Sequence, residues 1–152
     1  FKWRIIGENS DFIYHDEFVS KNKKKFIAIP NIQNKSEKYF PPKKLIMHYS
    51  GSHLYINLAR IESFGLTFIE ALASKTPIVS LGSTGINKIF KNDNVSFFVK
   101  NINDITKILK RIQSNPKLLS NIQKKTYQSI KQFNLDDNVE QITIFYSKFI
   151  NY

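Results

Sequence analysis

Two glutamates and a glycine lie close together in the segment ESFGLTFIEALASKTPIVSL, residues 62–81. An apolar run precedes this segment, and Gly65 stands where a helix is expected to begin. Glycine leaves room for an anion to approach the amides of the first helical turn, and those amides together with the helix dipole hold phosphate groups. Glu70 follows on the same helix, where its carboxylate could accept hydrogen bonds from paired sugar hydroxyls. The segment therefore predicts donors for a diphosphate and acceptors for a sugar within one loop–helix unit.

A simpler interpretation of the same residues is also available. Glu62 can be a surface carboxylate on a loop, and Glu70 can lie on a solvated helix face. From spacing alone this interpretation is favoured, because two glutamates near a glycine occur often by chance. In either case both side chains are expected at a loop or an exposed helix face. The choice between a binding site and two surface carboxylates therefore depends on the elements around them.

Apolar runs alternate with helical segments along the chain. The predicted strands are residues 1–6, 26–29, 54–58, 77–81 and 96–99; the predicted helices are residues 41–49, 64–74 and 86–90, with further helices from 103 or 104, from 115, and from 136 or 137. Such a rhythm is typical of a parallel sheet covered on both faces, with ligands beyond the carboxyl ends of the strands. We expect an α/β fold with a Rossmann-like parallel sheet, helices on both faces and a helical C-terminal tail. Residues 1–152 are expected to form a single domain, with the strands 54–58 and 77–81 as adjacent interior strands.

The composition excludes several other classes of protein. With 41% hydrophobic residues the chain is globular, and with no cysteine it has neither a disulfide scaffold nor thiol chemistry. No apolar run is long enough to span a bilayer. The net charge of +11 comes mostly from single lysines, and the one dense run, KNKKK at residues 21–25, is most simply a solvated loop. Nucleic acid is therefore not the expected partner, and an anionic membrane surface is the better candidate.

The region around the two glutamates resembles a known family. Glu62-x7-Glu70, with Phe-Gly-Leu between them and Ala-Leu-Ala followed by Thr-Pro-Ile-Val after them, is similar to the E-x7-E segment of GT-B glycosyltransferases, of the retaining family 4 type. The neighbouring segments 49–58, 85–89, 101–112 and 115–118 resemble that family too. Because the resemblance extends over nearly the whole chain, we now favour a donor-binding segment over two surface carboxylates.

The resemblance implies a role for each residue of the segment. Glu62 is expected at the hydroxyls of the transferred sugar, as the catalytic residue, and Glu70 on the ribose hydroxyls. Donor binding is completed by Ser63 and by Phe64, Gly65, Leu66 and Thr67, and the backbone amides of these last four are expected to face the phosphates and the sugar. Catalysis then depends on stabilising the diphosphate leaving group as its negative charge develops. No Asp-x-Asp pair is present, so neither a metal nor another cofactor is expected.

The resemblance also implies that part of the enzyme precedes Phe1. The chain has no initial Met and opens directly on a strand, so we expect it to be truncated at its N-terminus and inactive alone. The absent part would include an acceptor-binding domain and a loop with Arg and Lys for the donor phosphates. One departure lies inside the motif: Lys75 stands where Gly often ends the helix, with a small left-handed strain expected.

The expected partners follow from the same family. They are a nucleotide-sugar donor and a glycan or lipid-linked acceptor, and the reaction is hexosyl transfer in cell-envelope polysaccharide synthesis. The expected location is cytoplasmic, with peripheral contact at the inner face of the membrane. A non-catalytic module of the same fold, which binds a nucleotide or a partner protein, is the alternative.

Overall fold

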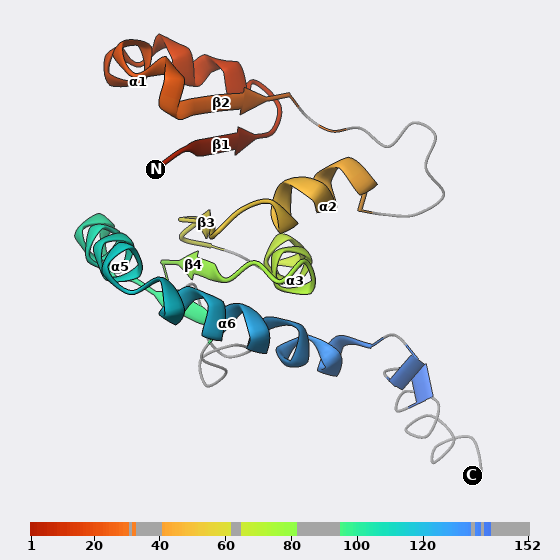
Figure 1. Cartoon of the computed structure of the whole chain (residues 1–152). Coiled ribbons are helices and arrows are strands. Elements are labelled where there is room, and N and C mark those ends of the chain that lie inside the picture. The colour runs from red at the N-terminus through yellow and green to blue at the C-terminus, as the bar shows by residue number, and fades with distance from the viewer. Residues whose placement is uncertain are drawn as a thin grey trace. The chain divides into compact units, whose positions relative to one another are not determined.

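The computed structural model of the 152-residue chain describes residues 1–30, 32, 41–61, 65–81, 95–134, 136–137 and 139–140. The chain divides into two compact units, the first unit Phe1–Met47 and the second unit His48–Tyr152. Figure 1 labels the helices and strands of both.

The first unit is built on a pair of parallel strands. β1 (Trp3–Ile6) and β2 (Phe26–Ile29) pair in register from Trp3 opposite Phe26, which confirms both predicted strands. Their connection forms the 3₁₀ helix η1 (Ser10–His15), the helix α1 (Glu17–Lys21) and the 3₁₀ helix η2 (Lys23–Lys25). No helix was predicted between the strands, because segments of three to six residues are too short to show a helical repeat.

Hydrogen bonds hold this connection against the strand β2. The Ser10 hydroxyl donates to the Ile29 carbonyl at 2.8 Å, and the Ala28 amide donates to the Tyr14 hydroxyl at 3.0 Å. Asp16 caps α1 by accepting from the Val19 amide at 3.0 Å, and Val19 itself is buried. The polar side chains therefore fix the connection where little apolar surface is buried.

The second unit contains a three-stranded parallel sheet. Its strands β3 (Tyr55–Asn57), β4 (Ile78–Ser80) and β5 (Ser96–Phe98) lie in the order β3-β4-β5. Parallel pairing of β3 with β4 confirms the predicted arrangement of these neighbours. β4 is the middle strand, as expected, whereas β3 is an outer strand of this sheet within the described residues. The apolar pattern of residues 54–58 did not distinguish the two positions.

The helices follow the predicted order along the chain. They are α2 (Lys43–Ser50), α3 (Leu66–Ala73), α5 (Ile102–Ser114), α6 (Pro116–Ser129) and the 3₁₀ helix η3 (Lys131–Phe133). Pro116 occupies the first turn of α6, where its missing amide costs nothing. The predicted helix 86–90 and most of the predicted last helix lie outside the described residues.

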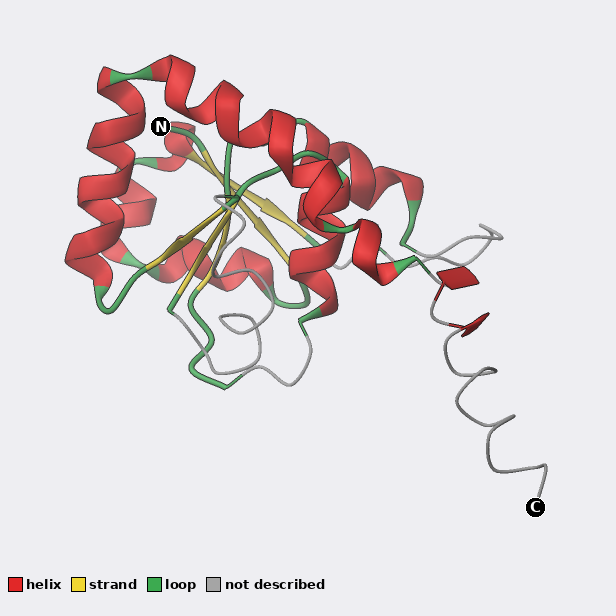
Figure 2. Ribbon diagram, turned by 90° about the horizontal axis from the view of Figure 1, so that it is seen from below, coloured by secondary structure: helices red, strands yellow, loops and turns green. Residues whose placement is uncertain are grey.

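Helices cover both faces of the three-stranded sheet (Figure 2). Successive side chains of a strand point to opposite faces, so both faces carry apolar side chains that need a covering layer. Val79 of β4 packs with Val99 and with Ile105 of α5 on one face. On the other face Tyr55 of β3 meets Phe68 of α3 edge to face, with ring centroids 5.6 Å apart. α6 contacts both α3 and α5. This is the expected α/β architecture.

Two helix ends test finer predictions. Asn101 caps α5 by accepting from the amides of Asn103 and Asp104 at 3.0 and 3.3 Å, so the predicted caps at Asn103 or Asp104 were wrong: both residues already lie in the first turn. After α3, Lys75 adopts φ 61°, which confirms the expected left-handed strain.

Within the described residues, no helix is both long and apolar enough to traverse a bilayer.

Candidate functional site

The start of α3 is formed by Gly65. This buried glycine has φ 75° and ψ 50°, a left-handed conformation that is strained for any residue with a Cβ. Its carbonyl accepts from the amides of Phe68 at 2.9 Å and Ile69 at 3.4 Å. The amides of Leu66 and Thr67 have no hydrogen-bond partner among the described residues, and both residues are exposed. The first turn of α3 can therefore offer two amide donors to an anion.

The position of α3 in the chain fixes where these donors lie. α3 connects β3 to the parallel strand β4, so its N-terminus lies at the carboxyl ends of the strands. Asn57 and Ser80 end β3 and β4 in register at this same edge. Parallel α/β sheets bind their ligands there. The predicted residues Glu62, Ser63 and Phe64 lie outside the described residues.

Glu70 lies in the second turn of α3 and is held by a tyrosine from α2. The Tyr49 hydroxyl donates to Oε2 of Glu70 at 3.1 Å, and Tyr49 is buried, with 7% of its surface exposed. Glu70 is half-buried, so its expected place on an exposed helix face was wrong; the end of α2 packs beside it. Its other oxygen, Oε1, has no partner within the described part of the chain.

Burial controls the protonation of this pair. It raises the pKa of the Glu70 carboxyl, against the opposing effect of the hydrogen bond from Tyr49. It also raises the pKa of the Tyr49 hydroxyl, and the neighbouring Tyr55 and Glu70 raise it further. Tyr49 therefore remains a proton donor at neutral pH. Glu70 presents a carboxylate that burial destabilises and that additional hydroxyl donors would stabilise.

Tyr49 is itself fixed by its surroundings. The Thr76 hydroxyl donates to the Tyr49 carbonyl at 2.7 Å in a fully buried contact. The Tyr49 ring meets the Tyr55 ring edge to face at 5.5 Å, and Tyr55 in turn meets Phe68. Sequence reasoning missed Tyr49 and Thr76 as site residues, since contacts across 21 and 27 residues leave no local pattern.

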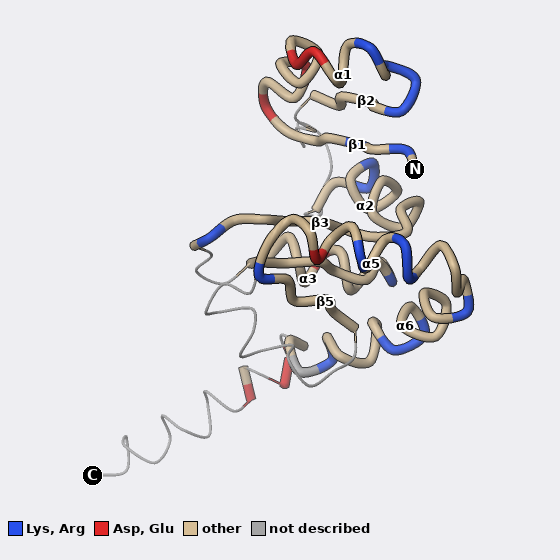
Figure 3. Tube along the Cα trace, turned by 90° about the vertical axis from the view of Figure 1, so that its left-hand side faces the viewer, with Lys and Arg blue, Asp and Glu red and all other residues tan. Residues whose placement is uncertain are grey.

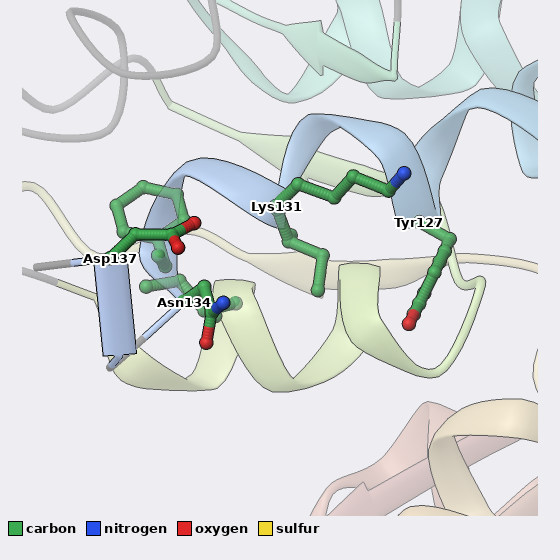
Figure 4. Close-up of a pocket in the computed structure, with 7 residues that line it drawn as sticks. Tyr127, Lys131, Asn134 and Asp137 are labelled. Carbon is green, nitrogen blue, oxygen red and sulfur yellow. The ribbon is translucent and has the colours of Figure 1, made fainter.

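A cavity of about 480 Å³ lies on another side of α3 (Figure 4). It is lined by Ile69, Tyr127, Ile130, Lys131, Phe133, Asn134 and Asp137. Of the α3 residues only Ile69 reaches it, so neither Gly65 nor Glu70 forms part of its wall. The described residues of the predicted donor site, Gly65, Leu66, Thr67 and Glu70, are not among the residues that line this cavity.

A metal site would require a cluster of ligating side chains. Nowhere among the residues that the structure describes do three or more His, Cys, Asp or Glu side chains gather closely enough to hold an ion. The expectation of a reaction without a metal remains a prediction.

One relative in sequence and two solved structures show what the chain is similar to. Alpha-monoglucosyldiacylglycerol synthase of Acholeplasma laidlawii is 25% identical over 130 residues, which are 85% of this chain and 31% of that protein. Sucrose-phosphate synthase of Thermosynechococcus elongatus matches with a TM-score of 0.75 and 17% identity, over 97% of this chain and 38% of the other.

A second solved structure is the pneumococcal O-GlcNAc transferase GtfA in complex with UDP and GlcNAc. It matches with a TM-score of 0.68 and 15% identity, over 99% of this chain and 30% of that one. The chain thus spans about a third of the length of these proteins. Both structural matches show the GT-B type of α/β fold, and the sequence model of glycosyl transferases group 1 matches residues 4–129. The chain therefore belongs to the family of glycosyl transferases group 1.

Proposed function

We propose that this chain is the donor-binding domain of a retaining glycosyltransferase of the family 4 type, with Glu62-x7-Glu70 as its motif. The observation that carries the proposal is the start of α3. There the amides of Leu66 and Thr67 have no partner among the described residues, and Glu70, held by Tyr49, lies in the next turn of the same helix. Anion donors and a fixed carboxylate at the carboxyl ends of parallel strands suit a nucleoside diphosphate.

Glu70 is proposed to bind the ribose of the donor. A carboxylate can accept about four hydrogen bonds, and Tyr49 uses only part of Oε2. Oε1 and the remaining capacity of Oε2 can therefore accept from two neighbouring hydroxyls. The hydrogen bond from Tyr49 limits the rotation of the carboxylate, so less ordering is required when the ribose binds.

The amides near Gly65 are proposed to bind the phosphates, with Ser63, Phe64, Leu66 and Thr67 as the other donor-binding residues. In the transfer, the bond between the sugar and the diphosphate breaks, and negative charge accumulates on the departing oxygen. Amides already oriented toward that oxygen stabilise the charge without reorganisation. Glu62 is proposed to act at the hydroxyls of the transferred sugar. Neither a metal nor a cofactor is proposed for this chemistry.

The rest of the enzyme is proposed to bind the acceptor. An N-terminal domain would supply the acceptor site and the basic loop for the phosphates, so residues 1–152 alone would be inactive. The name of the Acholeplasma relative supports hexosyl transfer to a lipid-linked acceptor, and a glycan acceptor is the other possibility. The enzyme would act in cell-envelope synthesis, in the cytoplasm, with peripheral contact at the inner face of the membrane.

Calorimetric titration of the chain with UDP, GDP and ADP, each in the presence of EDTA, tests this proposal. We expect weak binding of at least one diphosphate and no requirement for a metal. The absence of both heat and a thermal shift with all three would overturn the donor-site assignment. Binding of a diphosphate together with failure of the full-length protein to transfer any sugar would instead indicate the non-catalytic module.

A further inference from the structure

The connection between β1 and β2 carries an exposed basic and aromatic surface. Its residues are Phe18 on α1 and Lys23, Lys24 and Lys25, which form η2; together they are called the lysine turn. Phe18 has 65% of its surface exposed, although its neighbour Val19 is buried. The lysine turn thus combines an exposed phenyl group with three consecutive lysines.

Packing brings the aromatic and basic parts of the lysine turn together. The Phe18 ring meets the Phe26 ring edge to face, with centroids 6.2 Å apart, and Phe26 directly follows Lys25 in the chain. The Asn22 side chain also donates to the Phe18 carbonyl at 2.9 Å, which ties the end of α1 to the start of η2. Phe18 is therefore held beside the lysines.

The three lysines are also available to an external anion. Lys21, at the end of α1, is paired with Glu17, whereas none of Lys23, Lys24 and Lys25 has an ion-pair partner among the described residues. All three are exposed. In Figure 3 they belong to the blue segment between α1 and β2, and the red segments of the same connection lie at the start of α1 and where the chain leaves β1. Within the described part of the chain, no ion pair therefore neutralises the positive charge of this turn.

We propose that the lysine turn binds the surface of an anionic lipid bilayer. Lysines at such a surface are attracted by acidic headgroups, and an exposed phenyl group gains free energy when its apolar ring is buried at the boundary between headgroups and acyl chains. A single-stranded nucleic acid would attract the lysines as well and could stack a base on the Phe18 ring, so an RNA is included in the test as the competing partner. The lysine turn would supply the membrane contact that the proposed function includes, so this inference rests on the proposed function for its location at the membrane.

The test is sedimentation of the chain with phosphatidylglycerol vesicles and with phosphatidylcholine vesicles. We expect binding to the former only, weakened by added salt because surface charges are screened. Replacement of Lys23, Lys24 and Lys25 by Gln should lower the affinity on the order of 100-fold, and Phe18→Ser about tenfold. Removal of the same charge from the exposed residues Lys117, Lys124 and Lys125 of α6, again by Gln, should change it little.

Three outcomes would overturn the inference. They are an absence of binding to phosphatidylglycerol vesicles, an equal loss in the two triple variants, and unchanged binding of Phe18→Ser together with tighter binding of a 20-nucleotide RNA. Trp3 is the single tryptophan and lies on β1, so its fluorescence shows whether the first unit remains folded in each variant. Diphosphate titration of the same variants keeps the two proposals separate, because vesicle binding can fail while the donor site is intact.

Discussion

The region around α3 and the connection between β1 and β2 both link parallel strands, but they bury very different amounts of side chain. In the second unit Phe68, Leu72 and Ile78 are at most 1% exposed, and Thr76 is fully buried with them. In the first unit Phe12 and Phe18 are 63% and 65% exposed. The two regions therefore suit different roles. Dense packing around α3 fixes the geometry of the Tyr49–Glu70 pair, whereas the loosely covered connection between β1 and β2 leaves side chains such as Phe18 free to contact a partner surface.

A matched pair of phenylalanines gives the largest expected difference between the regions. Phe68→Ala should lower the free energy of unfolding by about 3–5 kcal/mol, because it leaves a cavity in a filled core. Phe18→Ala should cost about 1 kcal/mol or less, mainly from the lost edge contact with Phe26. Urea unfolding followed by circular dichroism provides the measurement. A similar cost for both would show that the connection between β1 and β2 is as tightly packed as α3.

The buried hydroxyl of Thr76 offers a finer comparison within the second unit. Thr76→Val removes the 2.7 Å donor to the buried carbonyl of Tyr49, which still accepts from the Ser52 amide at 2.8 Å, so the change should cost about 0.5–1.5 kcal/mol. Thr126 is equally buried, but its hydroxyl donates to the Gln123 carbonyl of its own helix α6. Thr126→Val should therefore cost less. Thermal unfolding of both variants distinguishes them, and an equal loss would mean that the Thr76 contact does not fix Tyr49.

The smallest expected effect is a gain in stability at Lys75, one of the non-glycine residues with a left-handed backbone. Lys75 has φ 61° after α3, and Lys75→Gly should stabilise the chain by about 1 kcal/mol, since glycine carries no Cβ to clash. Asn9 has φ 57° in the first unit, where asparagine already tolerates this conformation, so Asn9→Gly should change little. Melting temperatures check both. A loss of stability in Lys75→Gly would show that the lysine side chain contributes more than the strain costs.

Much of the fold could be predicted from the sequence because its strands are short apolar runs bounded by Pro, Gly or Asn. β2 matches its predicted residues 26–29, and Gly65 was expected where α3 begins. The helices between β1 and β2 could not be predicted, because Ser10 and Tyr14 act through hydrogen bonds to a strand and not through an apolar repeat. The cap of α5 was misplaced by two or three residues for a similar reason: several polar residues at its start suit a cap equally well.

The site was predictable only in part. Gly65, Leu66, Thr67 and Glu70 belong to one local segment whose spacing is visible in the sequence. The partners of that segment are not local. Tyr49 reaches Glu70 only because α2 and α3 pack on the same side of β3, and this arrangement also explains why Glu70 is half-buried. Such contacts depend on the assembled fold.

The affinity of one nucleoside diphosphate for two glutamate variants tests the central claim most directly. Glu70→Gln keeps the shape of the side chain but loses a charge-assisted acceptor worth about 1.5–3 kcal/mol, so the affinity should fall at least about tenfold. Glu62→Gln should bind the diphosphate like the parent, because Glu62 is assigned to the transferred sugar. Melting temperatures near that of the parent would confirm that both variants are folded. If both variants bind like the parent, neither glutamate contacts the nucleotide and the donor-site assignment is wrong; if only Glu62→Gln loses affinity, the two roles are reversed.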